Sequence, residues 1–376
     1  MCSGSLKLTA SQVREDTAIQ ELVASDPNIA GRIILEHLKR LRGATVSLSE
    51  VYRARNLILN DMFGSWEDGF QKLESLVTVW KTKNPTSYVD CKFNANGEFV
   101  RVFISHPYAP LYEMHGQKVA GVDRAILKHG KYQSDHLALV GRDGDKNNII
   151  LGIAVCASES EDNYEWFFRC CLSAGVKLNE MPLFSDRRPG VMAALYKLNV
   201  ATSRFCTGHI FHNIQENFKT KVPPDMDTLL YRVQAATSND EYNRLLNTLE
   251  LTHKDIAAYI RSIDPEQWVL YTALRSSRLY GWRSTNFAGY QDAAASEPRG
   301  TLPFQFLQYY MAKFMEDAYN FRSRDARSWL QEGHTLTKYA RDKLKDASKA
   351  AGFCMVLPTD DSRAFVHDTR NKQTDL

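Results

Sequence analysis

The sequence predicts an α/β fold, in which a mixed β-sheet follows a helical N-terminal region and is interrupted by an all-helical insertion. Three observations lead to this class. Residues 1–86 carry apolar side chains at helical spacing. Short β-type runs separated by Gly, Asp and Asn begin at about residue 87 and alternate with helices up to residue 218. Residues 219–280 then return to an uninterrupted helical period, which is typical of an inserted subdomain.

The N-terminal region is predicted to consist of amphipathic helices. In "NIAGRIILEHLKRLRG" the spacing places Ile29, Ile33, Ile34 and Leu38 on one face. The next segment, "SLSEVYRARNLILNDMFG", begins with a serine suited to a helix N-cap. A further amphipathic segment spans residues 65–82 and ends at Asn84-Pro85. The basic residues on the outer faces are expected to form a solvated surface rather than a DNA footprint.

The order of the following elements predicts a sheet with both antiparallel and parallel strands. Five β-type runs come first: "YVDCKF", "EFVRVFIS", "QKVAGVDRAIL", "DHLALVGRD" and "NIILGIAVCAS". A helix at 163–175, a strand at 182–186, a helix from Gly190, a strand in "ATSRFCTGH" and the helix "IFHNIQENFK" follow. Sequential strands joined by short turns form a meander, and strands joined through helices are parallel.

The predicted domain organisation begins with the helical region 1–86 and the first part of the core, 87–218. Three further segments follow. Pro223-Pro224 marks the entry to the insertion at 219–280, and we expect Trp268, Tyr280 and Trp282 to be core aromatics. Residues 281–335, which contain the helical stretch "LPFQFLQYYMAKFMEDAYNFRSRDARSWLQ", are expected to return to the core. Residues 336–376 are expected to be a linker-like segment.

The composition is that of a soluble globular protein. The chain has 376 residues, of which 44% are hydrophobic and 24% charged, enough for two or three domains. No stretch reaches the roughly eighteen apolar residues of a membrane span, so no membrane partner is expected. Seven cysteines without framework spacing favour reduced thiols and an intracellular setting. The net charge of +3 is too small to indicate a nucleic-acid partner by itself.

Two aspartates are the strongest candidates for catalysis. Asp123 is expected at or near the end of the first core strand, and Asp186 ends the fourth. Three meander strands, a helix and a fourth strand form the ribonuclease-H-like arrangement, in which the first and fourth strands are neighbours. Two carboxylates there can share Mg²⁺ or Mn²⁺ ions, which activate and stabilise the oxygens of phosphoryl transfer. The alternative is that Asp186 only caps the following helix.

The sequence also resembles the Mutator-like element (MULE) transposases over most of its length. "YRARNLILNDMFGSWEDGFQKLESLVTVWKTKNPTS" is similar to the segment that precedes their catalytic domain. The stretch from "GVDRAIL" to "EWFFRCC" is similar to the first half of that domain, with Glu161, Trp166 and Phe168 at the characteristic spacing. "FSDRRPGVMAAL" matches the second-Asp motif, and "RFCTGHIFHNIQENF" matches the following Cys-x-x-His motif of Cys206 and His209.

The resemblance implies a DDE-type core, which requires a third carboxylate after the insertion. In the matching stretch, "RSTNFAGYQDAAASEPRG", Gly289 stands where the family has Glu. The next acidic residues, Asp292 and Glu297, are the candidate replacements, although Pro298 disturbs a helix beside Glu297. This departure predicts impaired catalysis.

Cys206 and His209 make an incomplete zinc site, because a structural site needs four ligands and a catalytic site usually three. One alternative is a small buried cysteine beside a hydrogen-bonding, helix-capping histidine. The resemblance instead implies a role near the active site. Five arginines are candidates for contacts to the DNA backbone. They are Arg187, Arg188, Arg275, Arg278 and Arg283.

The resemblance implies a nuclear DNA transposase that binds transposon ends, uses Mg²⁺ or Mn²⁺ and forms a homo-oligomer. The C-terminal stretch resembles the linker that leads into a SWIM-type finger. The chain looks like a transposase body without its zinc-finger modules. The alternative is a domesticated, non-cleaving derivative that binds DNA or regulates transcription, which Gly289 favours. A third reading, a ribonuclease-H-like nuclease of RNA or Holliday-type DNA, fits poorly with the large helical insertion.

Overall fold

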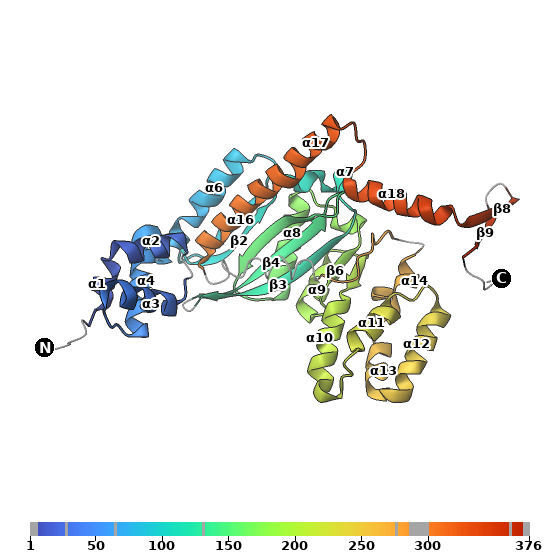
Figure 1. Ribbon diagram of the computed structural model, residues 1–376, viewed down its shortest axis with the longest axis horizontal. Coiled ribbons are helices and arrows are strands. Elements are labelled where there is room, and N and C mark those ends of the chain that lie inside the picture. Colours follow the sequence, from blue (N-terminus) through green and yellow to red (C-terminus); the bar gives the residue numbers. More distant parts are fainter. Residues whose placement is uncertain are drawn as a thin grey trace.

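The computed structural model describes residues 7–26, 29–63, 66–129, 132–274, 277–285, 301–360 and 363–370. A twisted sheet lies at the centre of the molecule, and the N-terminal helices form a small bundle at one end of the sheet (Figure 1). A second group of helices, α10 to α14, extends from the opposite end of the sheet. The C-terminal helix α18 and its hairpin project from the body as an arm.

The N-terminal bundle consists of α1 (Ala10–Arg14), α2 (Thr17–Ser25), α3 (Gly31–Arg42) and α4 (Leu48–Phe63). Ile29, Ile34 and Leu38 are buried in its core, as the helical spacing predicts. Ile33 is 51% exposed, so its predicted place on the same buried face is wrong. It lies one position before Ile34, and successive helical residues point about 100° apart.

The sheet has seven strands in the order β1-β2-β5-β4-β3-β6-β7. Their bounds are β1 (Val89–Phe93), β2 (Phe99–Ser105), β3 (Ala120–His129), β4 (Tyr132–Arg142), β5 (Asn148–Cys156), β6 (Leu183–Ser185) and β7 (Ser203–Phe205). Strands β3, β4 and β5 form the antiparallel meander, while β6 pairs parallel to β3 and β7 parallel to β6. The predicted mixed α/β class is confirmed, and the first meander strand β3 neighbours β6, the strand that follows the meander, as predicted.

Helices cover both faces of the sheet, each over its own apolar core. Helices α8 (Glu161–Ser173) and α9 (Pro189–Lys197) pack on one face, where Phe103, Phe167 and Phe168 are fully buried. Helices α6 (Leu73–Lys83) and α16 (Pro303–Asp317) pack on the other, around Phe306 and Tyr310. Helix α5 (Trp66–Gln71) precedes α6. The short elements η1 (Ala109–Leu111), α7 (Tyr112–His115) and η2 (Leu178–Glu180) connect the strands and helices.

The helices that follow β7 share a third core. They are α10 (Thr207–Phe218), η3 (Lys219–Lys221), α11 (Met226–Gln234), α12 (Asn239–Thr252), α13 (Lys254–Arg261), η4 (Pro265–Gln267) and α14 (Leu270–Ala273). Trp268 is buried in this core, and the described part of 219–280 contains no strand, as predicted. Trp282 is also buried, but Tyr280 is 38% exposed, so its prediction as a core aromatic is wrong. It stands in a left-handed turn, with a φ of 50°.

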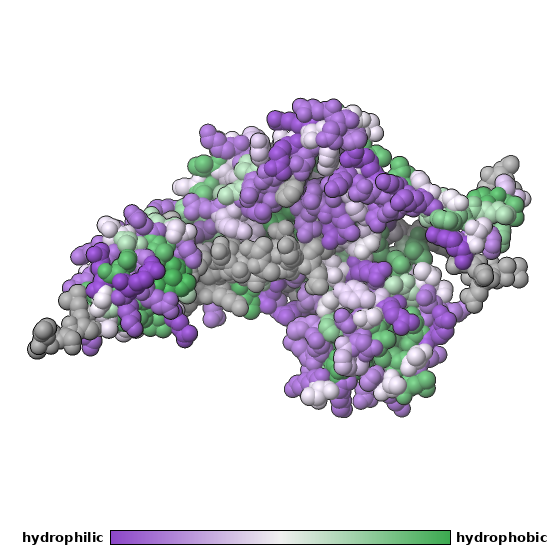
Figure 2. All heavy atoms as spheres, viewed as in Figure 1, coloured by the Kyte–Doolittle hydropathy of each residue, from purple (hydrophilic) through white to green (hydrophobic). Residues whose placement is uncertain are grey.

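The C-terminal part is more ordered than the expected linker. Helix α16 continues through a π-helical turn at Ala318–Arg324 (η6) into α17 (Asp325–Gln331). Helix α18 (Lys338–Ala351) and the hairpin of β8 (Cys354–Asp360) and β9 (Arg363–Asp368) then form the arm. Apolar side chains gather on the surface of this hairpin (Figure 2). Among the helices that the structure describes, none is both long enough and apolar enough to cross a membrane.

Candidate functional site

Asp123 lies on β3 and Asp186 directly follows β6, and these two strands are parallel neighbours, as the order of elements predicts. Ala120 pairs with Leu183 and Gly121 with Phe184. The same register, continued for two residues, would set Asp123 opposite Asp186, which follows the last residue of β6. Each carboxylate accepts a hydrogen bond from the next backbone N–H, at 2.8 Å for Asp123 and 2.5 Å for Asp186.

The predicted place of Asp123 at the end of its strand is wrong. It is the fourth residue of β3, which continues to His129 paired with β4. The pairing with β6 stops at the level of Gly121 and Phe184, because β6 itself ends at Ser185. The lip of the parallel part of the sheet therefore lies in the middle of β3.

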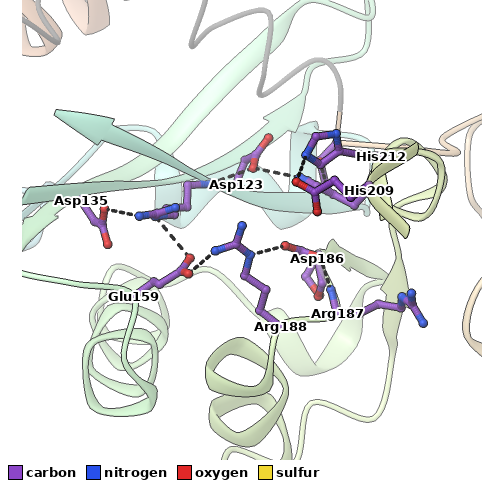
Figure 3. Close-up of polar contacts among 12 residues, drawn as sticks. Asp123, Asp135, Glu159, Asp186, Arg187, Arg188, His209 and His212 are labelled. Carbon is purple, nitrogen blue, oxygen red and sulfur yellow. Dashed lines mark hydrogen bonds and ion pairs between the residues drawn. The ribbon is translucent and has the colours of Figure 1, made fainter. Parts of the chain in front are cut away.

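Both aspartates line one pocket of about 190 Å³ (Figure 3). Three further segments contribute side chains to it. Glu159 comes from the loop between β5 and α8, Arg188 precedes α9, and His209 lies in the first turn of α10. The side chains of Asp123 and Asp186 are 15% and 21% exposed, so solvent reaches both carboxylates.

Arginines bind the carboxylates on the Asp186 side of the pocket. Arg188 Nε lies 3.0 Å from Asp186 Oδ2, and another nitrogen of its guanidinium bonds Glu159. Arg124 pairs with Glu159 at 3.2 Å and with the buried Asp135 at 2.8 Å. Opposite charges therefore alternate in the series Asp135, Arg124, Glu159, Arg188, Asp186. Figure 3 shows the contacts of Arg188 with Glu159 and Asp186.

His209 supplies the positive charge on the Asp123 side. Its Nε2 lies 3.7 Å from Asp123 Oδ1. Burial opposes protonation of this ring, but contact with the Cys206 thiol and the charges of Asp123 and Asp186 raise the pKa of His209 to about 9. At neutral pH the ring is therefore a cation that faces Asp123.

The Cys206 side chain contacts both His209 and Thr285. The Cys206 sulfur is buried and accepts hydrogen bonds from Thr285 N at 3.1 Å and Thr285 Oγ1 at 3.3 Å. Burial raises the pKa of the thiol, but His209 and Thr285 outweigh it and lower the pKa below its usual value. Cys206 is buried at the N-cap of α10 and His209 contacts Thr285 Oγ1 at 3.5 Å, so the alternative of a buried cysteine beside a hydrogen-bonding histidine stays open. The bonds from Thr285 also attach the segment that leaves the helical insertion to the start of α10.

The pocket as arranged does not fit a metal ion with three protein ligands. Carboxylate oxygens are suitable donors for Mg²⁺ or Mn²⁺, and Asp123 and Asp186 provide them. Within the described ranges, however, no three His, Cys, Asp or Glu side chains converge as metal ligands. Asp186 is bound to a guanidinium and Asp123 faces an imidazole. Gly289, Asp292 and Glu297 lie outside the described residues, so the third-carboxylate prediction stays a prediction.

The predicted DNA-contacting arginines fall into two groups. Arg187 lies over the rings of Phe205 and Tyr259 and donates to the Tyr259 hydroxyl, so it is engaged within the protein as Arg188 is. Arg278 and Arg283 are exposed. Thr207 N donates to Arg283 O at 3.1 Å, which places Arg283 beside the start of α10. Arg275 lies outside the described residues.

Sequence reasoning missed Glu159 and Arg124 as members of the pocket. Arg124 directly follows Asp123, and Glu159 lies three residues beyond the end of β5. Their positions at the lip of the sheet were the available signal, because loops at strand ends carry functional side chains.

Comparison with known proteins adds little to this geometry. No family model matches the chain. No curated protein matches it either. Among solved structures, the crystal structure of a pre-cleavage Mos1 transpososome is similar over 65% of this chain and 79% of that chain, with 11% sequence identity and a TM-score of 0.16. A superposition this poor supports no conclusion, so the function is inferred from the residues and their arrangement.

Proposed function

We propose that this chain is the ribonuclease-H-like body of a MULE-type transposase, that it binds DNA, and that its DNA cleavage is weak or lost. The observation that carries the proposal is that Asp123 of β3 and Asp186, directly after the neighbouring parallel strand β6, line one pocket in a sheet with the meander-then-parallel order. The sequence motifs that resemble the MULE family occur on these same elements.

The proposed DNA binding rests on two exposed arginines rather than on the net charge. Arg278 and Arg283 are exposed on the segment that returns from the helical insertion. Hydrogen bonds from Thr285 to Cys206 hold this segment against the start of α10, next to the pocket. Arginines so placed contact phosphates in a salt-dependent way, without reading sequence. We propose transposon-end DNA as the partner and the nucleus as the compartment.

Weak cleavage is proposed because the pocket holds protein cations where a transposase needs metal ions. Arg188 forms an ion pair with Asp186, and His209 faces Asp123. At the position where the third carboxylate is expected, the sequence has Gly289. A cleaving transposase is the second candidate, and the alignment of the two aspartates at one lip of the sheet favours it. Mg²⁺ or Mn²⁺ would then be its cofactor.

The salt dependence of duplex DNA binding tests the proposal. We expect the logarithm of the affinity to fall linearly with the logarithm of salt concentration. Replacing both Arg278 and Arg283 by Gln should reduce the slope by about two and weaken binding severalfold. Arg169→Gln is the matched control, because it removes an exposed charge that is paired with Glu165 on α8. Binding that ignores salt, or that survives the double substitution unchanged, would contradict this placement of DNA.

A further inference from the structure

We propose that a second pocket, beside α14, takes one unpaired base of a DNA strand, which stacks on Tyr280 and donates a hydrogen bond to Gln234. This cavity is called the Tyr280 pocket below. Its volume is about 260 Å³, and its lining comes from Gln234 of α11, Leu270 of α14 and the segment that returns from the helical insertion. The inference rests on the proposed function in one respect, the contact of DNA with that returning segment.

The walls of the Tyr280 pocket are largely apolar. Leu270, Leu274, Leu279, Tyr280 and Trp282 contribute to them. Leu279 and Trp282 are buried, whereas Leu274 is 54% and Tyr280 38% exposed. Concave sites with apolar and aromatic walls and few polar groups are typical of ligand pockets. The open apolar surface of Leu274 and Tyr280 therefore suits a flat, uncharged group that covers it.

The backbone fixes Tyr280 at this pocket. Tyr280 and Gly281 have φ angles of 50° and 77°, and a positive φ is unfavourable for a bulky side chain. Such a conformation persists only where the surrounding structure enforces it. Here Trp282 N donates to Leu279 O at 2.7 Å, and both of these residues are buried. The turn therefore presents the Tyr280 ring as a fixed platform, and stacking on such a ring accepts any base.

Gln234 supplies a hydrogen-bonding group to the pocket. The residue is 1% exposed, and its Nε2 lies 3.5 Å from Trp268 O. Its Oε1 has no hydrogen-bond partner among the described residues. A buried acceptor without a donor is destabilising, so a ligand N–H that reaches it gains affinity. A base taken out of its pair offers such an N–H on the edge that it uses for pairing.

The charged side chains beside the pocket indicate that the base belongs to a nucleotide. Arg283 lines the pocket and is exposed, and Arg278 is exposed on the same segment. Guanidinium groups match the geometry of phosphate. Arg283 O accepts a hydrogen bond from Thr207 N at 3.1 Å, two residues before His209 of the pocket that Asp123 lines. A strand whose phosphates contact Arg283 would therefore pass close to both pockets.

The size of the pocket favours a single base. Its 260 Å³ is less than the roughly 300 to 1,000 Å³ of pockets for drug-sized ligands. Taking a paired base out of a duplex costs unstacking and unpairing energy, and this cost is least for a base that is already unpaired. We therefore expect the pocket to favour DNA that carries an unpaired base over fully paired duplex.

Fluorescence anisotropy with short duplex DNA that carries one bulged adenine tests the proposal. The controls are the same duplex without the bulge and the same duplex with an abasic bulge, which bends as freely but offers no base. The unmodified chain should bind the bulged adenine about tenfold more tightly than either control, because the base stacks in the pocket.

Variants of the pocket then assign this gain. Tyr280→Ala should remove it and Tyr280→Phe should keep it, because stacking needs the ring and not the hydroxyl. Gln234→Met, which is similar in size but lacks the acceptor, should reduce the gain severalfold. Tyr196→Ala is the matched control, because Tyr196 of α9 is an exposed ring that does not line the pocket. Circular dichroism melting confirms that each variant is folded.

The outcomes separate this inference from the proposed function. Equal, salt-dependent binding of all three duplexes would overturn the base pocket and keep the DNA-binding body, whereas no binding to any of them would overturn both. An equal gain for the abasic bulge, or a gain that survives Tyr280→Ala, would also overturn the pocket. Binding of adenosine monophosphate that depends on Tyr280, without a gain for the bulged adenine, would assign the pocket to a free nucleotide and overturn the DNA strand as its source.

Discussion

The central sheet and the C-terminal arm both contain strands next to helices, but their side chains differ in burial. In the sheet, side chains on both faces are buried under helices, including Phe103 of β2 on one face and Ile104 on the other. In the arm, α18 has no buried residue, and Met355 and Val356 of β8 are more than half exposed. An isolated helix of this length and a lone two-stranded hairpin are both marginal in water. Helical or strand patterning alone therefore does not tell which elements form a core.

The arm is attached mainly at its first turn. Thr337 Oγ1 donates to Gly144 O at 2.8 Å, and Tyr339 N donates to Asp145 Oδ1 at 2.6 Å. Both contacts are to the turn between β4 and β5. We expect the sheet to determine global stability and the arm to unfold locally.

The largest expected difference comes from removing one large side chain in each region. Phe306→Ala should lower the free energy of unfolding by about 3 to 5 kcal/mol, because Phe306 of α16 is fully buried in the core between this helix and the sheet. Leu344→Ala in α18 should change it by less than about 0.5 kcal/mol, because Leu344 is 58% exposed. Urea unfolding measures both. Similar losses in the two variants would mean that the arm packs on the body in solution.

Acid should destabilise the sheet through a buried histidine. Burial and then the charge of Arg322 lower the pKa of His106 to about 3. The unfolded chain takes up this proton below about pH 6.5, whereas the folded chain stays neutral until about pH 3. Stability is therefore present above pH 6.5 and falls as the pH decreases, by roughly 2 to 3 kcal/mol between pH 6.5 and 4.5.

Urea unfolding at several pH values measures this acid effect. His106→Gln should flatten the decline over that range, and His367→Gln in the arm should leave it as in the unmodified chain. An unchanged decline in His106→Gln would assign the acid sensitivity to other groups.

A smaller effect is expected from adding one methyl group at a glycine in each region. A Cβ at Gly152 of β5 would meet the Phe103 ring at 2.7 Å, so Gly152→Ala should cost about 1 to 3 kcal/mol through overpacking. A Cβ at Gly144, where the arm is attached, would meet Thr337 at an ordinary 3.4 Å. Gly144→Ala should therefore change stability little. Thermal melting of the two variants checks the contrast, and an equal cost at both positions would contradict it.

The sequence predicted the backbone arrangement of the site better than its side-chain contacts. The order of strands and helices was enough to bring Asp123 and Asp186 together, because a parallel strand after a meander and a helix pairs with the first strand. The continuation of β3 beyond Asp123 was missed, since the sequence does not show where a neighbouring strand ends.

The charge pairing in the pocket could not be predicted in the same way. Arg188 and Glu159 are 29 residues apart, and Cys206 and Thr285 are 79 apart. These contacts depend on loops whose conformations follow no residue period. Arg188 was assigned to DNA for its charge alone, whereas its nearest partners are the protein's own carboxylates.

The most direct measurement of the central claim is divalent-metal-dependent cleavage of terminal inverted-repeat DNA, with nicking of supercoiled plasmid as a second substrate. We expect no detectable cleavage by the unmodified chain, and cleavage by a variant that combines Gly289→Glu with Arg188→Gln, lost again on Asp186→Asn. The combined variant restores the carboxylate that the family resemblance places there and removes the competing guanidinium. Robust cleavage by the unmodified chain that disappears in Asp292→Asn or Glu297→Gln would contradict this view and identify the third carboxylate.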